Sequence, residues 1–304
     1  MFLLTQQLNY FWFENNIFLM KSIIATLSIL TCTLSLSAQY YYKDILGTAD
    51  INRMISLYQT NNVKTVTATG YDEDGRKNAD FSETHYFFPD RNTLRIATRN
   101  NQTITNQYFR FDKNNLVTSV TDTSLSLVSL TNYTYDDKNN IISIKNTVTD
   151  ASDSIYVNEL HQWFYNETGR PVRMLRIVNN RDTTDVRFTI DDNGNVIDEW
   201  PFINRISRQK TYYYYDSKNR MTDIVRYNVA ARKLLPDFMF EYTDQNQLKQ
   251  KTTTIGTMGV TYLIWTFVYN DKGLKSKEAT FKKDKKLEQL EMVGKIEYAY
   301  TYNP

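Results

Sequence analysis

The stretch Tyr213-Tyr214-Tyr215-Asp216-Ser217-Lys218-Asn219 contains the pattern that decides the fold. Two aromatic residues, Tyr213 and Tyr215, stand two positions apart. An acidic residue follows Tyr215 directly, and Asn219 stands four positions after Tyr215. Residues two apart lie on one face of a strand. Asp at the start of a type I turn accepts a backbone hydrogen bond, and Gly or Asn adopts the positive φ that closes such a hairpin with a bulge. The stretch therefore predicts a strand end, a tight turn and a new strand.

The same pattern recurs along the chain. We call its second aromatic position the anchor; the nine anchors are Tyr71, Phe88, Phe111, Tyr135, Tyr165, Ile190, Tyr215, Tyr242 and Tyr269. Four residues after them stand only Gly or Asn, which are Gly75, Asn92, Asn115, Asn139, Gly169, Gly194, Asn219, Asn246 and Gly273. Two residues before the anchors, eight of nine positions are aromatic. This coincidence identifies an internal repeat and predicts a turn at each Gly or Asn.

The repeat predicts an all-β fold of tandem antiparallel β-hairpins. Successive anchors are 17 to 30 residues apart, which is enough for two strands and two turns. We expect the repeats, over about residues 63–302, to form one large open or curled meander sheet. A short helix at about residues 50–58, with Ile51, Ile55 and Tyr58 on one face, is expected to cap the N-terminal edge of that sheet.

These units resemble the YD repeats of the RHS (rearrangement hot spot) family. Tyr71-Asp72-Glu73-Asp74-Gly75-Arg76 and Tyr215-Asp216-Ser217-Lys218-Asn219-Arg220 carry the Tyr-Asp and Gly-Arg-like core, and the resemblance covers about residues 69–302. It implies β-hairpins that wind into a curled sheet or shell. Spacing here is irregular, Asn often replaces Gly, and no toxin domain follows the repeats, so a toxin-delivery role is not carried over.

The N-terminal segment predicts export. Lys21 begins a basic region, an apolar run follows, and Ala38 stands where signal peptidase needs a small residue. We divide the chain into a leader at residues 1–38, with a signal peptide at 20–38, and a single β-repeat domain at 39–304. Residues 1–19 are interpreted as an over-extended gene start. Alternatives are a retained anchor or a lipoprotein through Cys32. The expected location is the periplasm, the outer-membrane surface or the medium, with no transmembrane segment after cleavage.

Composition gives no sign of chemistry at a defined site. The net charge of +2 gives no electrostatic case for nucleic acid, and the single cysteine lies in the leader. His85 and His161 are interpreted as strand positions on a Tyr-rich surface, because neither has metal-ligand or nucleophile spacing. Acidic turns such as residues 191–195 lack the EF-hand pattern. We predict no catalytic residue, metal or cofactor.

The sheet face opposite the aromatic face is the candidate binding surface. It carries the aromatic residues Phe87, Phe164, Tyr212 and Tyr214. Exposed aromatic side chains stack on sugar rings or contact protein partners. The favoured function is a non-enzymatic scaffold for an unknown protein or cell-envelope partner. The alternatives are a module that binds envelope polysaccharide and, third, an enzyme of unknown type.

Overall fold

The computed structural model describes residues 40–304, except 125–126, 151, 153–155, 256–260 and 285–289. The predicted leader at residues 1–38, its signal peptide, the interpretation of residues 1–19 and the lipoprotein alternative at Cys32 all lie outside the described residues. No helix in the described part of the chain is long and apolar enough to cross a membrane.

The described chain forms one helix, one 3₁₀ turn and a series of strands, as the repeat predicts. The helix α2 spans Lys43–Thr60 and the 3₁₀ turn η3 spans Pro89–Arg91. The first strands are β1 (Val63–Asp72), β2 (Lys77–Phe88), β3 (Thr93–Asn100), β4 (Thr103–Phe111), β5 (Val117–Ser124), β6 (Leu127–Tyr135), β7 (Ile141–Asp150), β8 (Tyr156–Tyr165), β9 (Pro171–Val178) and β10 (Asp182–Ile190). The others are β11 (Val196–Ile203), β12 (Ile206–Ser207), β13 (Thr211–Tyr215), β14 (Met221–Asn228), β15 (Lys233–Tyr242), β16 (Leu248–Ile255), β17 (Thr261–Tyr269), β18 (Lys275–Asp284) and β19 (Leu290–Tyr302).

The strands form a closed antiparallel barrel, so the prediction of an open or curled sheet is wrong. Apart from the two-residue β12, each strand pairs with the strand that precedes it and the strand that follows it in the ring. The last strand, β19, returns to pair with β1 along nearly its whole length, with Val66 opposite Tyr300. The two-residue β12 pairs only with β11 among the described strands, which leaves 18 strands in the ring. In an open sheet, β1 and β19 would be edge strands with unpaired backbone groups. Closure gives each of them a partner.

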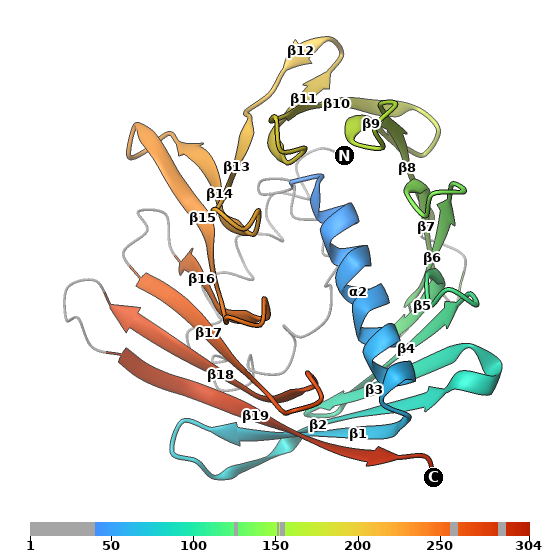
Figure 1. Cartoon of the computed structure of the whole chain (residues 1–304), viewed down its shortest axis with the longest axis vertical. Helices are drawn as coiled ribbons and strands as arrows, with labels where there is room; N and C mark the ends of the chain where they lie inside the picture. The colour runs from blue at the N-terminus through green and yellow to red at the C-terminus, as the bar shows by residue number, and fades with distance from the viewer. Residues whose placement is uncertain (1–39, 125–126, 151, 153–155, 256–260, 285–289) are drawn as a thin grey trace.

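The helix α2 lies inside the ring of strands and crosses it from the β8–β13 side to the β1–β5 side (Figure 1). The prediction of a short edge cap at residues 50–58 is therefore wrong in two respects. The helix is longer, and a closed barrel has no free edge to cover. The apolar side chains of the helix pack against the inner wall of the barrel. Ile55 is fully buried there, and Tyr58 is 5% exposed.

Two apolar clusters join α2 to the wall. One surrounds the C-terminal half of the helix, with residues of β1–β6 and the residue before β18. Its buried members are Ile55, Tyr58, Val63, Val66, Phe87, Leu94, Ile96, Phe109, Phe111, Val117, Tyr133 and Leu274. The other surrounds the N-terminal end, with residues of β7–β14, and its buried members are Tyr41, Ile141, Trp163, Met174, Val186, Phe188, Val196, Tyr213, Met221 and Ile224. Both clusters bury the aromatic face of the repeat, so this face forms the inner wall.

The turns have the backbone geometry that Gly and Asn favour. All nine positions four residues after the anchors have positive φ, from 49° at Asn92 to 83° at Gly194. In the turn after Tyr215, the Asp216 carboxylate accepts hydrogen bonds from the N–H groups of Lys218 and Arg220, at 2.9 and 3.0 Å. The strand register shifts by one residue at Tyr215, as a β-bulge requires.

Five anchor tyrosines, and Tyr300 of the last strand, link their repeat to the one before it. The hydroxyl of Tyr215 donates a hydrogen bond of 2.8 Å to the carbonyl oxygen of Val196, the first residue of β11. The same bond joins Tyr135 to Val117, Tyr165 to Ile141, Tyr242 to Met221, Tyr269 to Leu248 and Tyr300 to Lys275, at 2.7 to 2.9 Å. Each bonded carbonyl belongs to the first residue of an outgoing strand. The recurrence of Tyr, rather than Phe, therefore has a structural reason.

Candidate functional site

The outer wall holds most of the predicted binding surface. Phe164 on β8 and Tyr214 on β13 are 42% and 48% exposed, and Tyr212 is half-buried beside them. Tyr212 pairs with Asp198 of β11, which places β13 next to the strands that lead back to β8. The structure therefore brings Phe164, Tyr212 and Tyr214 to one side of the barrel, on its outer face.

Phe87 is a correction, because it lies inside the barrel and is only 4% exposed. Its neighbours Tyr86 and Phe88 point outward instead, at 37% and 44% exposed. The hairpin between β2 and β3 pairs regularly, with Phe88 opposite Thr93, and closes through η3 without a register shift. Of the other eight anchor turns, seven shift the register by one residue, and the turn after Tyr71 shifts it further, with Thr69 opposite Ser82 and Tyr71 opposite Lys77. Because this turn has no bulge, Phe87 points inward, whereas the residues that precede other anchors, such as Phe164 and Tyr214, point outward.

A row of exposed side chains crosses four neighbouring strands on the outer wall. Phe164 of β8 stands opposite Arg173 of β9, Arg173 opposite Arg187 of β10, and Arg187 opposite Trp200 of β11. Their exposed fractions are 42% for Phe164, 48% and 63% for the two arginine side chains, and 38% for Trp200. We call Phe164, Arg173, Arg187 and Trp200 the outer row. Three strand spacings of ~4.8 Å give it a length of roughly 14 Å.

Neighbouring groups hold the outer row in place. The Arg173 guanidinium lies 5.8 Å from the centre of the Phe164 ring and donates to Asp185 at 2.8 Å. The Arg187 guanidinium lies 4.6 Å from the ring centre of Phe202. Lys210 lies 4.7 Å from the Trp200 ring. Cations over aromatic faces fix side chains that would otherwise be mobile, so the outer row is a prepared surface of flat rings and guanidinium groups.

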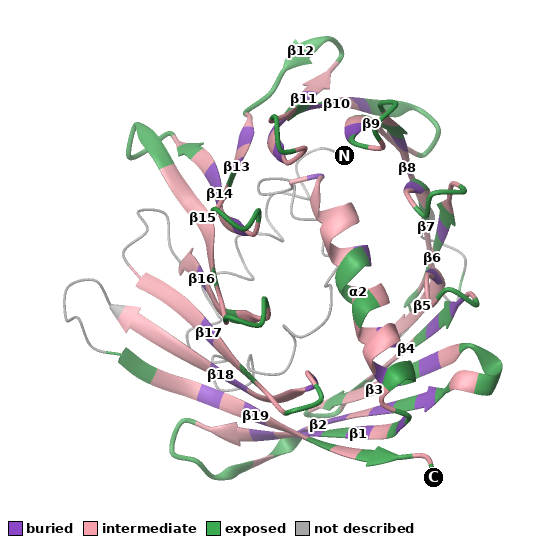
Figure 2. Ribbon diagram, viewed as in Figure 1, coloured by how far each residue is buried: buried purple, intermediate pink, exposed green. Residues whose placement is uncertain are grey.

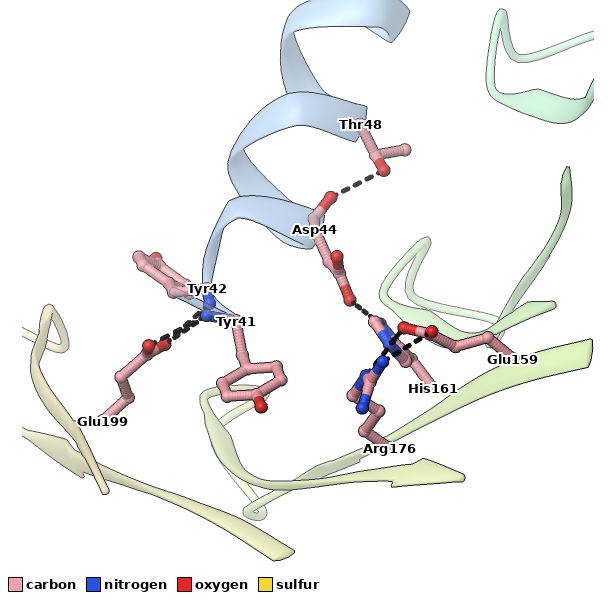
Figure 3. A network of polar contacts seen from close by, with 8 residues as sticks. All are labelled: Tyr41, Tyr42, Asp44, Thr48, Glu159, His161, Arg176 and Glu199. Atoms are coloured by element: carbon pink, nitrogen blue, oxygen red, sulfur yellow. Dashed lines mark hydrogen bonds and ion pairs between the residues drawn. The ribbon is translucent and has the colours of Figure 1, made fainter. Parts of the chain in front are cut away.

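The inner wall carries a buried polar network at the start of α2 (Figure 3). His161 of β8 is 7% exposed, its Nδ1 lies 2.5 Å from Asp44 in the first turn of α2, and its Nε2 lies 2.7 Å from Glu159. Arg176 donates two hydrogen bonds of 2.8 Å to the Glu159 carboxylate. Burial opposes charge on His161, but Asp44 and Glu159 raise its pKa to about 9.

Glu199 caps the same end of the helix. Its carboxylate accepts the backbone N–H groups of Tyr41 and Tyr42 at 2.8 to 2.9 Å (Figure 3). The first N–H groups of a helix have no partner within the helix, and Tyr42 at the N-cap supplies no side-chain bond. Glu199 on the wall therefore replaces a local cap residue. Complete burial raises its pKa to about 7, against the lowering effect of these donors.

His85 repeats this arrangement at the other end of the helix. Its Nδ1 lies 2.8 Å from the hydroxyl of Tyr58, in the last turn of α2, and its Nε2 lies 2.9 Å from Glu83. The second oxygen of Glu83 accepts the Thr98 hydroxyl at 2.9 Å. Each histidine thus joins α2 to a glutamate two residues earlier on its own strand.

The histidine clamps were missed by the sequence reasoning, which placed both histidines on a surface. The signal was present, because Glu83-Thr84-His85 and Glu159-Leu160-His161 place an acid and a histidine on one face of a strand. The two-residue spacing of Glu and His did not show whether these side chains lie on the inner or the outer face of the sheet. Within the described ranges, no three His, Cys, Asp or Glu side chains gather as metal ligands would.

The fold and these sites define the protein as a closed antiparallel β-barrel with a helix clamped inside it. No protein-family model matches the chain, and no curated protein matches it in sequence. The YD-repeat resemblance is therefore an interpretation of the residues.

Solved structures show limited similarity to the chain. It is similar to a porin-like protein from Bacteroides uniformis, over 79% of this chain and 98% of that one, with 8% identity and a TM-score of 0.38. A porin-like protein from Bacteroides vulgatus matches over 80% and 98%, with 14% identity and a TM-score of 0.28. The Tc holotoxin pore of Photorhabdus luminescens matches over 71% of this chain and 14% of that one, with 11% identity and a TM-score of 0.29. At these values no function follows, so function has to be argued from the residues.

Proposed function

We propose that this protein is an exported, non-enzymatic binding protein that presents the outer wall of its barrel to a protein or cell-envelope partner. The observation that carries the proposal is the outer row, with Phe164 and Trp200 at its ends and Arg173 and Arg187 between them. Aromatic and arginine side chains are enriched where protein partners bind, because they bury large area and still offer hydrogen bonds.

The charge pattern of the outer wall supports contact with water and with a polar partner. Arg173 and Arg187 lie within strands and share Asp185, at 2.8 and 3.5 Å. Arg95 lies within β3, over the exposed rings of Tyr86 and Tyr108. Charged groups within strands keep such a wall hydrated. Two guanidinium groups at the middle of the outer row favour a partner that offers carboxylate or phosphate groups.

The acidic residues on the inner wall and on α2 have structural roles, which supports the proposal that the protein is not an enzyme. Glu159 and Asp44 bind His161, and Glu199 binds the helix N-terminus. The groups that most resemble a catalytic cluster are thus occupied in holding α2. An acid or base for catalysis has to reach a substrate proton.

The alternative partner is an envelope polysaccharide. Phe164, Trp200 and Tyr214 are exposed on the same side of the barrel. A linear ligand that spans three strands would reach both ends of the outer row. Stacking of sugar rings on aromatic faces would then contribute more than the guanidinium groups.

Site-specific photo-cross-linking in intact producing cells tests the protein-partner proposal. A benzophenone side chain at Phe164 should capture a discrete partner, and the same side chain at Phe88, equally exposed on another part of the wall, should not. The double variant Arg173→Glu, Arg187→Glu should abolish capture at position 164. Equal capture at both positions would contradict a specific surface.

A fluorescence titration tests the polysaccharide alternative. Trp200 is 38% exposed, whereas Trp163 and Trp265 are 3% and 6% exposed. A saturable change in emission with one polysaccharide, lost in Trp200→Phe, would favour the sugar-binding function. No change across a panel of envelope polysaccharides, together with capture at position 164, would favour the protein partner.

A further inference from the structure

One face of α2 is reached by water although strands surround the helix. Ala49, Asp50 and Arg53 are exposed, and Figure 2 shows this exposed stretch inside the ring. Asp50 faces β15–β18, because its charge acts on Tyr242, Lys251, Tyr269 and Lys275, one from each of these strands. The interior between this face and β15–β18 is therefore wetter than the two apolar clusters on the other sides of the helix.

Lys251 of β16 points into this part of the interior. It stands opposite Phe240 and Trp265 in the neighbouring strands, and Trp265 is 6% exposed. The ammonium lies 4.7 Å from the ring centre of Phe238 and 5.5 Å from that of Trp265. Rings on two sides attract the cation but accept no strong hydrogen bond.

No acidic group in the described part of the chain forms an ion pair with Lys251. Lys275, on the same inner wall, differs, because its ammonium lies 3.0 Å from Glu278. Burial lowers the pKa of Lys251, and the more distant charges of Glu278 and Asp50 only partly oppose this effect. An ammonium that is partly desolvated and lacks an anion costs free energy, which a bound anion would recover.

Asp50 does not fill this role. It lies one helical turn from Arg53. Partial desolvation inside the barrel raises the pKa of Asp50, and the charges of Arg53, Lys275 and Lys251 only partly oppose this rise. Asp50 forms no ion pair with Lys251 among the described residues, and two aromatic rings lie beside the ammonium instead. This geometry favours an anionic ligand at Lys251.

We propose that the interior between the Asp50 face of α2 and β15–β18 binds a small organic anion with an apolar ring body. Lys251 binds the carboxylate, sulfonate or phosphate group of the ligand, and the rings of Phe238 and Trp265 contact its apolar part. This site lies on the inner wall and is independent of the outer row.

A pair of matched dyes tests the site in the complete chain. 8-Anilino-1-naphthalenesulfonate carries a sulfonate, and N-phenyl-1-naphthylamine has the same rings without it. Arg173→Gln and Arg187→Gln are introduced first, so that the outer row cannot supply the anion contact. We expect the sulfonate dye to bind at least about tenfold more tightly than the neutral dye, as a charge-assisted hydrogen bond predicts.

Lys251→Met and Lys251→Gln should both remove this preference. Lys251→Arg should keep it, and Lys249→Met, two residues away at an exposed position, should leave it unchanged. Circular dichroism and thermal melting check that each variant is folded. Equal dissociation constants for the two dyes in the parent chain would overturn the proposal, and so would a preference that persists in folded Lys251→Met. Neither outcome bears on capture at Phe164, so the two proposals fail separately.

Discussion

His161 Nδ1 lies 2.5 Å from a carboxylate oxygen of Asp44, although 117 positions separate the two residues in the chain. Asp44 belongs to the first turn of α2, and His161 belongs to the inner wall at β8. The pair is almost completely buried, with 9% and 11% of the two side chains exposed. A buried ion pair is costly to break from one side, because the remaining charge loses its partner.

Replacement of His161 tests this clamp. We expect His161→Leu to lower the free energy of unfolding by about 3 kcal/mol, because Asp44 keeps its buried charge without a partner. Urea denaturation measures the change. Asp44→Asn combined with His161→Leu should cost less than the sum of the single replacements, and strict additivity would show that the two residues do not interact.

Stability should fall as the solution becomes alkaline. The pKa of His161 is about 9 in the folded protein and 6.5 without the fold, so its contribution is complete below pH 6.5 and is lost as pH rises through 9. Burial raises the pKa of Glu199 from 4.5 to about 7, so its contribution also falls with rising pH, but over a lower window from about pH 4.5 to 7. Thermal melts from pH 6 to 9.5 measure the loss. His161→Leu should reduce the slope above pH 7, and an unchanged slope would contradict the assignment.

Stability should also fall in acid through Glu159. Hydrogen bonds from His161 and Arg176 lower its folded pKa to about 2, against the desolvating effect of burial. A depressed carboxylate pKa stabilises the fold above the unfolded value of 4.5, and this contribution is lost as pH falls through about 2. Glu159 and His161 therefore place maximum stability between about pH 4.5 and 6.5, and the loss through Glu199 shifts the maximum toward the lower end of this range. Glu159→Gln should reduce the acid slope below pH 4.5 in urea denaturation.

The anchor hydroxyl has a measurable role in joining repeats. Tyr215→Phe removes only the hydroxyl that donates to Val196 at 2.8 Å. We expect a loss of about 1 kcal/mol, the usual net contribution of such a bond. Tyr214→Phe, which removes a hydroxyl from a ring that is 48% exposed, is the control and should change stability little. Equal effects of the two variants would contradict the role of the anchor.

The turn at Gly194 should not accept a β-branched residue. Its φ is +83°, and an added Cβ would lie 2.6 Å from the Arg170 side chain. Gly194→Val should cost at least about 1 kcal/mol, because an L-residue is strained at positive φ. Asn139→Gly, at φ 64°, should leave stability nearly unchanged in the same urea experiment.

A disulfide across the barrel seam tests closure directly. Thr65 of β1 stands opposite Thr301 of β19, and their hydroxyl oxygens are 2.6 Å apart. Thr65→Cys with Thr301→Cys, in a Cys32→Ser background, should oxidise readily and shift mobility on a non-reducing gel. Opposite residues of antiparallel strands have Cα atoms ~4.5–5.5 Å apart, within the range of disulfides. Thr65→Cys with Thr280→Cys should not form the bond.

The sequence determined the local structure of this protein. The spacing of aromatic, acidic and Gly or Asn residues predicted an all-β chain of hairpins, because turn chemistry and strand alternation act over a few residues. It misplaced Phe87, because the turn beginning at Pro89 lacks the bulge that sets the side-chain alternation elsewhere.

Only the tertiary structure decided closure, the position of the helix and the role of the histidines. Pairing of Val66 with Tyr300 depends on the twist accumulated over all the intervening strands, which no local pattern specifies. The clamp between Asp44 and His161 likewise joins residues that meet because the inner wall lies against α2. Short-range rules therefore fixed the hairpins, and the global geometry of the sheet determined what those hairpins enclose.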